Sequence, residues 1–144
     1  MKENMTNDYL QALRDDFESS PFWKHMGISF YRLEPGDVVI QIPVIRELMN
    51  TRNVLHGGAI TTILDAIMGV TICSAKEVLI ATASLTTQFL APVTDGTLYA
   101  SANIINPGQR IQHVEAKVLN ENGNTIAKAV GTFAIIKDLS KEES

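Results

Sequence analysis

The stretch from residue 54 to residue 75 constrains the fold more than any other part of the sequence. It consists almost entirely of apolar or small side chains, and between Arg52 and Lys76 the one formally charged side chain is Asp65. Its length and pattern predict a helix from about Gly57 to Ser74. A helix this apolar must be covered on more than one side, and a lone carboxylate within it is costly unless it has a partner or a chemical role.

The remaining patterns supply strands that can cover this helix. Asn7 caps a predicted amphipathic helix at Asp8–Ser19, which Ser20–Pro21 ends. Strands bounded by turn signals are predicted at Ile28–Leu33, Val38–Val44, Val78–Leu90, Thr97–Asn106, Gln109–Asn120 and Thr125–Ile136. Tight turns such as Glu34–Asp37 and Asn122–Gly123 require antiparallel neighbours. The sequence therefore predicts an α+β fold, a curved antiparallel sheet wrapped around the long helix.

Composition limits the class of protein. The 144 residues suit one domain, with residues 1–21 as a helical extension and Lys137–Ser144 as a charged, frayed tail. A net charge of -4 argues against a nucleic-acid partner, and Asp65 near the middle of the apolar run argues against a membrane-spanning helix. The one cysteine, Cys73, cannot form an internal disulfide, and the polar N-terminus has no apolar signal-peptide core. We expect a cytoplasmic protein.

The start of the long helix and its carboxylate offer complementary chemistry. Gly57 and Gly58 leave the first helical N–H groups open, and such groups bind anions or polarise carbonyl oxygens. Asp65 offers a base or a nucleophile. The helix start and Asp65 together therefore supply the two functions that an acyl-transfer hydrolase needs, an oxyanion site and a group that activates water or attacks. The eight residues between Gly57 and Asp65 span about 12 Å of helix, too far for both to reach one carbonyl. Two antiparallel helices across a two-fold axis can do so, which predicts a homodimer with shared sites.

Each of these residues also has a purely structural interpretation. Asp65 can pair with a buried arginine or accept hydrogen bonds from threonine or asparagine, and the two glycines can serve close helix packing. His56 precedes the glycines, but nine residues at about 100° each place it on the opposite side of the helix from Asp65. A His–Asp dyad within one subunit is therefore not expected. His56 either contacts substrate or water, or holds the loop through hydrogen bonds.

The strand after the helix carries a second polar feature. Strict alternation places four polar side chains on one face, with Leu85 and Phe89 on the other. The four are Thr82, Ser84, Thr86 and Gln88. Burial of such a face would need a use for it, which weakly indicates a site.

Several motifs together resemble the signature of hotdog-fold acyl-CoA thioesterases of the phenylacetyl-CoA thioesterase type. The main one is Asn50-x5-His56–Gly57–Gly58-x6-Asp65. Downstream segments also look like that family: Thr82, Gln88–Phe89–Leu90–Ala91–Pro92, Pro107–Gly108–Gln109–Arg110 and Ala127–Lys128–Ala129–Val130–Gly131–Thr132–Phe133. The resemblance covers about residues 22–136 and implies a hotdog fold.

The resemblance also implies roles for these residues. The Gly57 N–H would polarise the thioester carbonyl, with His56 supporting the carbonyl end. Asp65 of the partner subunit would activate water or attack directly. Asn50 would position water or substrate, and Thr82 matches a position where the family often keeps a hydroxyl near the carboxylate. The remaining candidates would bind substrate or coenzyme A: Gly58, Ser84, Gly108 and Arg110.

The chain departs from the family pattern at two positions. Asn53 stands where the family often has glycine three residues before the histidine, and asparagine can adopt a left-handed turn conformation at some cost. Gln109 interrupts the usual glycine–basic pair, and a solvated turn residue is as good an interpretation of Arg110 as a phosphate contact. The second departure weakens the inference about coenzyme contacts more than the inference about acyl chemistry.

Other catalytic signatures are missing from the sequence. It contains no G-x-S-x-G, phosphate-binding glycine loop or dinucleotide fingerprint, and its histidines and cysteine lack metal-ligand spacing. Our primary hypothesis is a thioesterase that cleaves acyl-CoA to a free acid and CoA without metal or cofactor, acting as a homodimer or a dimer of dimers. The rival hypothesis is a non-catalytic hotdog module that binds acyl-CoA or lipid.

Overall fold

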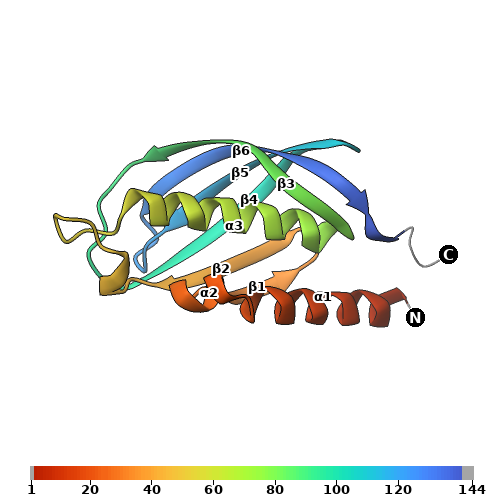
Figure 1. Cartoon of the computed structure of the whole chain (residues 1–144), viewed down its shortest axis with the longest axis horizontal. Helices are drawn as coiled ribbons and strands as arrows, with labels where there is room; N and C mark the ends of the chain where they lie inside the picture. The colour runs from red at the N-terminus through yellow and green to blue at the C-terminus, as the bar shows by residue number, and fades with distance from the viewer. Residues whose placement is uncertain (1, 141–144) are drawn as a thin grey trace.

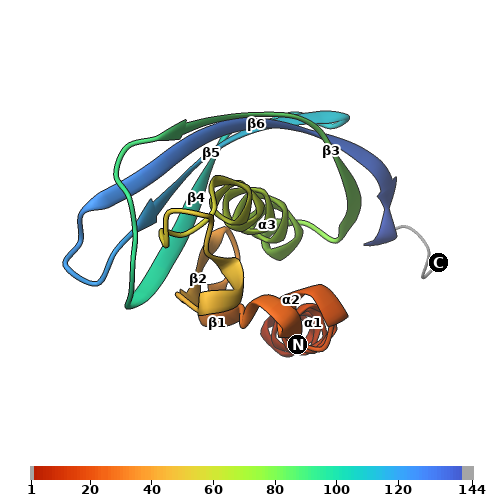
Figure 2. The same cartoon turned by 60° about the vertical axis from the view of Figure 1, so that its left-hand side comes forward.

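A six-stranded antiparallel sheet curves around one long helix in the computed structural model, which describes residues 2–140, with side chains from Asn7 onward (Figures 1 and 2). The strand order is β1-β2-β4-β5-β6-β3. The helices are α1 (Lys2–Glu18), α2 (Pro21–Met26), the short 3-10 helix η1 (Arg46–Leu48) and α3 (Gly57–Ala75). The strands are β1 (Ser29–Glu34), β2 (Asp37–Pro43), β3 (Val78–Phe89), β4 (Thr97–Pro107), β5 (Ile111–Leu119) and β6 (Thr125–Asp138). This arrangement confirms the predicted α+β class and the sheet around the helix.

The hydrophobic core lies between α3 and the concave face of the sheet. Buried and exposed residues alternate along β5, so its inward side chains from Gln112 to Val118 face the helix. By length and composition α3 could cross a membrane, but 67% of its most apolar window is buried inside the protein, as in a core helix. The remaining face of α3 is only half-buried, and it carries Thr62, Asp65, Ala66 and Gly69.

Local elements differ from the sequence predictions at both ends of the chain. The first helix begins at Lys2, before the predicted Asp8, and a second short helix, α2, forms where we expected only apolar bulk. Trp23 and Met26 of α2 are buried, so tertiary packing stabilises this six-residue helix. The tail was predicted to fray from Lys137, but Lys137 pairs with Leu79 within the sheet. Residues 141–144 of that tail lie outside the described residues.

Two predicted backbone features are confirmed. The loop before α3 holds Asn53 in the left-handed region, with φ of 59°, where the resemblance expected glycine or a tolerated asparagine. The turn between β5 and β6 places Gly123 at φ of 82°, a conformation that glycine adopts without steric cost. Both residues are short or lack a side chain, as these turns require.

A β-bulge in β3 changes which side chains share a face. Thr82 pairs with Phe133 and Ser84 pairs with Thr132, so Ala83 is the extra residue between them. Phe133 is buried in the core, and directly paired residues share a face, so Thr82 faces α3. Ser84 faces the outer side instead. The prediction that Thr82 shares a face with the other three polar residues of this strand is therefore wrong, because strict alternation is broken at Ala83.

Helix α1 is attached to the end of α3 by the Tyr9 hydroxyl, which donates a 2.6 Å hydrogen bond to the Cys73 carbonyl. Burial, with smaller contributions from Cys73 and Glu77, raises the pKa of Tyr9 from 10.0 to about 12. The unfolded chain therefore holds fewer protons than the folded protein between these two values. Stability that depends on the protonated hydroxyl is complete below pH 10 and is lost as the pH rises toward 12.

We expect Tyr9→Phe to lower the free energy of unfolding by about 1 kcal/mol near neutral pH, because one hydrogen bond is lost. The difference between the wild type and the variant should shrink between pH 10 and pH 12. Urea unfolding followed by circular dichroism across this range measures both quantities. A difference that stays constant with pH would contradict a role for the protonated hydroxyl.

Candidate active site

Asp65 is held by the strand beside it. The Thr82 hydroxyl donates a 2.8 Å hydrogen bond to Asp65 Oδ1, which leaves Oδ2 of the carboxylate available. The inward turn of Thr82 at the bulge makes this contact possible. Asp65 is half-buried in the single protomer, so the expectation of a helix buried on most sides fails for this face. The carboxylate is therefore oriented and open on one side, as a base or nucleophile must be.

The start of α3 is organised by His56. Its Nδ1 accepts a 2.7 Å hydrogen bond from the Gly58 N–H, so His56 is the N-cap of the helix. A Cβ atom on Gly58 would lie 2.9 Å from this nitrogen, so the ring needs glycine at that position. The Gly58 N–H is therefore already used by the protein and does not provide the open donor that the sequence suggested.

Two donors remain at this helix start. Among residues 2–140 we find no acceptor for the Gly57 N–H, which lies at the positive end of the helix dipole. Because His56 Nδ1 accepts a hydrogen bond, a neutral His56 ring carries its proton on Nε2. The exposed Nε2–H can thus donate to a bound group. Together the Gly57 N–H and His56 Nε2–H can stabilise negative charge on a carbonyl oxygen.

Asn50 belongs to the loop directly before α3. Its Oδ1 accepts hydrogen bonds from the Arg52 N–H at 2.8 Å and the Val54 N–H at 3.3 Å. The base of the loop is closed by His56, whose N–H donates to the Leu48 carbonyl. The Asn50 oxygen is therefore engaged in shaping the loop. Its amide nitrogen is the group with which Asn50 can contact water or substrate.

Phe89 lies at the candidate site, although sequence reasoning did not single it out. A Cβ atom on Gly57 would lie 3.3 Å from Phe89 Cε1, so the ring lies directly against the helix start. The ring is 55% exposed in the single protomer, which is high for a phenylalanine at a strand end. Its presence in the segment that carries the family resemblance was the available signal. Phe89 supplies an apolar surface beside the N–H groups that can donate to a carbonyl oxygen.

The coenzyme candidates lie on different parts of the sheet, Ser84 on β3 and Gly108 and Arg110 in the turn between β4 and β5. Ser84 points to the outer face, so the structure does not bring it to Asp65. Gly108 has a structural requirement, because a Cβ there would lie 2.3 Å from the Ile111 carbonyl oxygen. Arg110 follows in the same turn and is exposed, and no acidic group pairs with it in the described part of the chain. Its carbonyl accepts from the Ile135 N–H, which places it two strands from β3, roughly 10 Å at ordinary strand spacing.

The two halves of the chemistry remain apart within one protomer. Asp65 accepts a hydrogen bond from Thr82 in the middle of β3, whereas Gly57 lies beside the ring of Phe89, the last residue of β3. The separation along α3 is about 12 Å, as helix geometry requires. Within residues 2–140, no group of three potential metal-ligating side chains lies together. One protomer therefore keeps the oriented carboxylate apart from the N–H groups at the helix start that could donate to a carbonyl oxygen.

Comparison with known proteins identifies relatives across most of the chain. Residues 52–127 match the family model described as thioesterase superfamily, just over half of the sequence. A Thermoplasma acidophilum protein provisionally named an esterase, Ta0293, is 26% identical over 128 residues, which cover 88% of this chain and 97% of the relative. The acyl-coenzyme A thioesterase PaaI of Escherichia coli is 23% identical over 112 residues, which cover 77% of this chain and 79% of PaaI.

Solved structures share the fold. The Escherichia coli PaaI protein from the phenylacetic acid degradation operon superposes with a TM-score of 0.82 at 21% identity, covering 92% of this chain and 94% of that one. A thioesterase family protein from Silicibacter pomeroyi superposes with a TM-score of 0.81 at 27% identity, covering 90% and 98%. The sheet around a central helix is thus the hotdog fold that the resemblance implied.

The cap at His56 makes a testable contribution to stability. We expect His56→Ala to lower the free energy of unfolding by about 1 kcal/mol, because the Gly58 N–H loses its acceptor. His56→Asn should retain most of the stability, since asparagine is a preferred N-cap. Urea unfolding of the three proteins at neutral pH measures the difference. Equal losses in both variants would show that capping is not what His56 contributes.

Proposed function

Since this chain belongs to the thioesterase superfamily as a PaaI-like hotdog protein, we propose that it hydrolyses acyl-CoA to a carboxylic acid and CoA. Hydrolysis of thioesters in general follows from the family. Two groups on α3 support a specific site: a carboxylate that Thr82 orients, and a Gly57 N–H for which the described residues provide no acceptor. The acyl-CoA substrate and the roles of these residues are the proposal.

A complete site requires two protomers. Two α3 helices packed antiparallel would bring Gly57 of the partner subunit to Asp65, and the reverse contact would form a second site. The half-buried face of α3 suits this packing, because Thr62, Ala66 and Gly69 are small and permit close approach of two backbones. The exposed Phe89 ring would be covered in the same contact. The active form is therefore a homodimer with two shared sites.

The reaction follows from the two halves of the site. The thioester carbonyl oxygen accepts hydrogen bonds from the N–H of the partner's Gly57 and from Nε2–H of the partner's His56, which stabilise the developing oxyanion. Asp65 removes a proton from water as the water oxygen attacks the carbonyl carbon, and this proton passes to sulfur when the C–S bond breaks, which gives the free acid and the CoA thiol. In the alternative route, Asp65 attacks the carbon itself, and sulfur leaves with the bonding electrons and takes a proton from water. Water then hydrolyses the resulting acyl–Asp65 anhydride, which releases the acid and restores the carboxylate. Thr82 orients the carboxylate in both routes.

The nucleotide of CoA needs a cation beside the site. Arg110 is exposed and unpaired among the described residues, and its guanidinium suits phosphate geometry. Gly108 permits the tight turn that positions Arg110, because a Cβ atom at residue 108 would clash with the Ile111 carbonyl oxygen. Coenzyme A enters this scheme only as part of the substrate, and the site uses no further cofactor.

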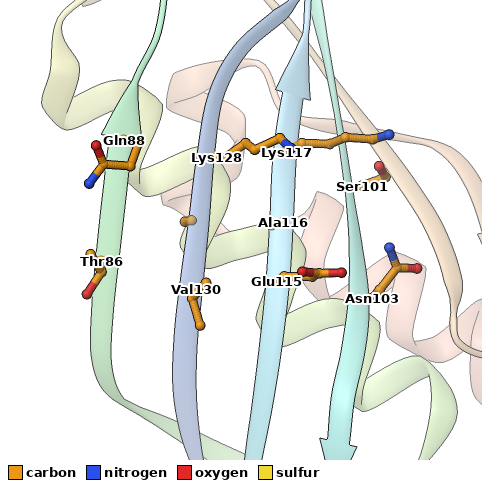
Figure 3. A pocket seen from close by; sticks show the side chains of 10 residues that line it. Thr86, Gln88, Ser101, Asn103, Glu115, Ala116, Lys117, Lys128 and Val130 are labelled. Atoms are coloured by element: carbon orange, nitrogen blue, oxygen red, sulfur yellow. The ribbon is translucent and has the colours of Figure 1, made fainter.

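Two such dimers can pair through the outer face of the sheet. A groove of about 510 Å³ lies there, away from α3, and it is lined by polar side chains that include Glu115, Lys117 and Lys128 (Figure 3). Carboxylate and ammonium groups on one face allow two copies of that face to meet with opposite charges in contact. A dimer of dimers is therefore part of the proposal.

Asp65→Asn should lower kcat by about 10² to 10⁴-fold, because the amide cannot accept the proton or attack the carbonyl. Thiol release from short, medium and aromatic acyl-CoAs measures the rate. Thr82→Val should lower kcat less, by roughly 10-fold, because the carboxylate loses the hydroxyl that orients it but can still accept a proton. Thr82→Ser keeps a hydroxyl and should stay close to the wild type.

Controls separate chemistry from folding. Asp16→Asn changes an exposed carboxylate on α1 and should leave the rate unchanged. Thermal unfolding and light scattering verify that each variant remains folded and dimeric. Unchanged hydrolysis in Asp65→Asn would refute the role of that carboxylate. Tight acyl-CoA binding without thiol release by the wild type would instead identify a non-catalytic binding module.

A further inference from the structure

Gln112 is a polar side chain within the apolar core. It faces α3 from β5, whose other inward side chains are Val114, Ala116 and Val118, and its surface is only 2% exposed. Its Oε1 atom has no hydrogen-bond donor within the described part of the chain. A buried amide with an unpaired oxygen costs free energy that an apolar side chain at the same position would not. Packing alone therefore does not explain a glutamine here.

The amide nitrogen of Gln112 binds the turn between β4 and β5. Nε2 donates a 3.3 Å hydrogen bond to the carbonyl oxygen of Gly108. Pro107 pairs with Gln112 at the end of the β4–β5 ladder, so Gly108 is the first residue of the connecting turn. A carbonyl can only accept, so the amide must direct its nitrogen toward Gly108 and its oxygen away. The hydrogen bond thus links the core to the turn and leaves Oε1 unpaired.

Two further contacts restrain the backbone of this turn. Gly108 lies so close to the end of the turn that a Cβ atom would be 2.3 Å from the Ile111 carbonyl oxygen. The Ile135 N–H of β6 donates a 2.8 Å hydrogen bond to the Arg110 carbonyl. The backbone is therefore held at both Gly108 and Arg110, while the side chain of Arg110 is exposed. The guanidinium group thus extends from an anchored backbone.

We propose that Gln112 is a positioning residue for the binding of coenzyme A. Its amide holds the Gly108 carbonyl and thereby fixes the turn in the shape that lets Arg110 bind a phosphate group of coenzyme A. This inference rests on the proposed function, which assigns the phosphate contact to Arg110. A backbone that is fixed in advance lowers the entropy lost when the arginine is ordered on its ligand. The unpaired Oε1 is the cost in stability of this arrangement.

The variant Gln112→Met separates a positioning role from a structural one. Methionine is unbranched and apolar, so it can fill the same space while removing both the N–H donor and the unpaired oxygen. Gly108 is half-buried, so its carbonyl can bond to water when the amide is gone. We expect the urea midpoint of the variant to equal or exceed that of the wild type, because no buried polar atom is left unpaired. A glutamine kept for folding would instead make the variant less stable.

Binding should weaken only for ligands that carry the nucleotide. We expect Gln112→Met to raise the Kd for CoA and the KM for acyl-CoA by about 10-fold with kcat close to the wild type, because a contact to a non-reacting part of the substrate is weakened. Pantetheine and acyl-pantetheine lack the nucleotide, so their Kd and KM should not change. Isothermal titration calorimetry measures Kd, and thiol release measures KM and kcat.

Two further variants test whether Gln112 acts through Arg110. Arg110→Ala should weaken CoA binding with the same selectivity, and the double variant should show no further loss, because the two residues support one contact. Gln41→Met makes the same substitution as Gln112→Met on β2, where Gln41 lies opposite Tyr99 rather than beside the turn. This matched control should leave the Kd for CoA unchanged.

The outcomes distinguish the positioning role from the proposed reaction. An unchanged Kd for CoA in Gln112→Met overturns the role, as does an equal loss for CoA and pantetheine or an additive loss in the double variant. A lower urea midpoint without a selective loss of CoA affinity shows that the amide serves folding alone. Unchanged CoA binding in Arg110→Ala overturns the arginine contact and this inference, while thiol release still reports on hydrolysis. A selective loss of CoA affinity in Gln112→Met, beside a wild type that releases no thiol, supports the positioning role and refutes hydrolysis.

Discussion

The hydrogen bond between the Thr82 hydroxyl and the Asp65 carboxylate is the contact on which the proposed site depends. It joins the central helix to the edge strand of the sheet, and it holds one carboxylate oxygen while leaving the other open. The bond exists because one extra residue, Ala83, turns Thr82 toward the helix. The orientation of the carboxylate and the face pattern of β3 therefore have one cause.

The elements of the fold and the curved sheet around the helix could be predicted from the sequence, but the strand order could not, since β3 pairs with β6 and not with β4, the next strand along the chain. An apolar helix of period 3.6 and strands of period 2 are local patterns, and the turn residues between the strands imposed antiparallel pairing. Asn53 could be placed in a left-handed turn because the motif around His56 required one there. The hypothesis that Gly57 and Asp65 act in one reaction followed from residue type and spacing, and it stays a prediction.

The details of the site could not be predicted, because they depend on contacts between distant segments. The bulge at Ala83 is defined by the partner strand β6, not by any residue in β3 itself. Likewise the His56 ring accepts a hydrogen bond from the Gly58 N–H. This contact depends on the rotamer of His56, which the residue spacing does not predict. The short helix at Pro21–Met26 is stabilised by burial of Trp23 and Met26 rather than by its own sequence.

The closure of β1 by α1 has a consequence for assembly. A sheet with two open edges can add a copy at each end and grow into an unlimited ribbon. Here the Glu18 carboxylate accepts a hydrogen bond from the Phe30 N–H, a donor at the β1 edge that an added strand would otherwise use. The N-terminal helix thus protects this edge of the sheet against pairing with another chain.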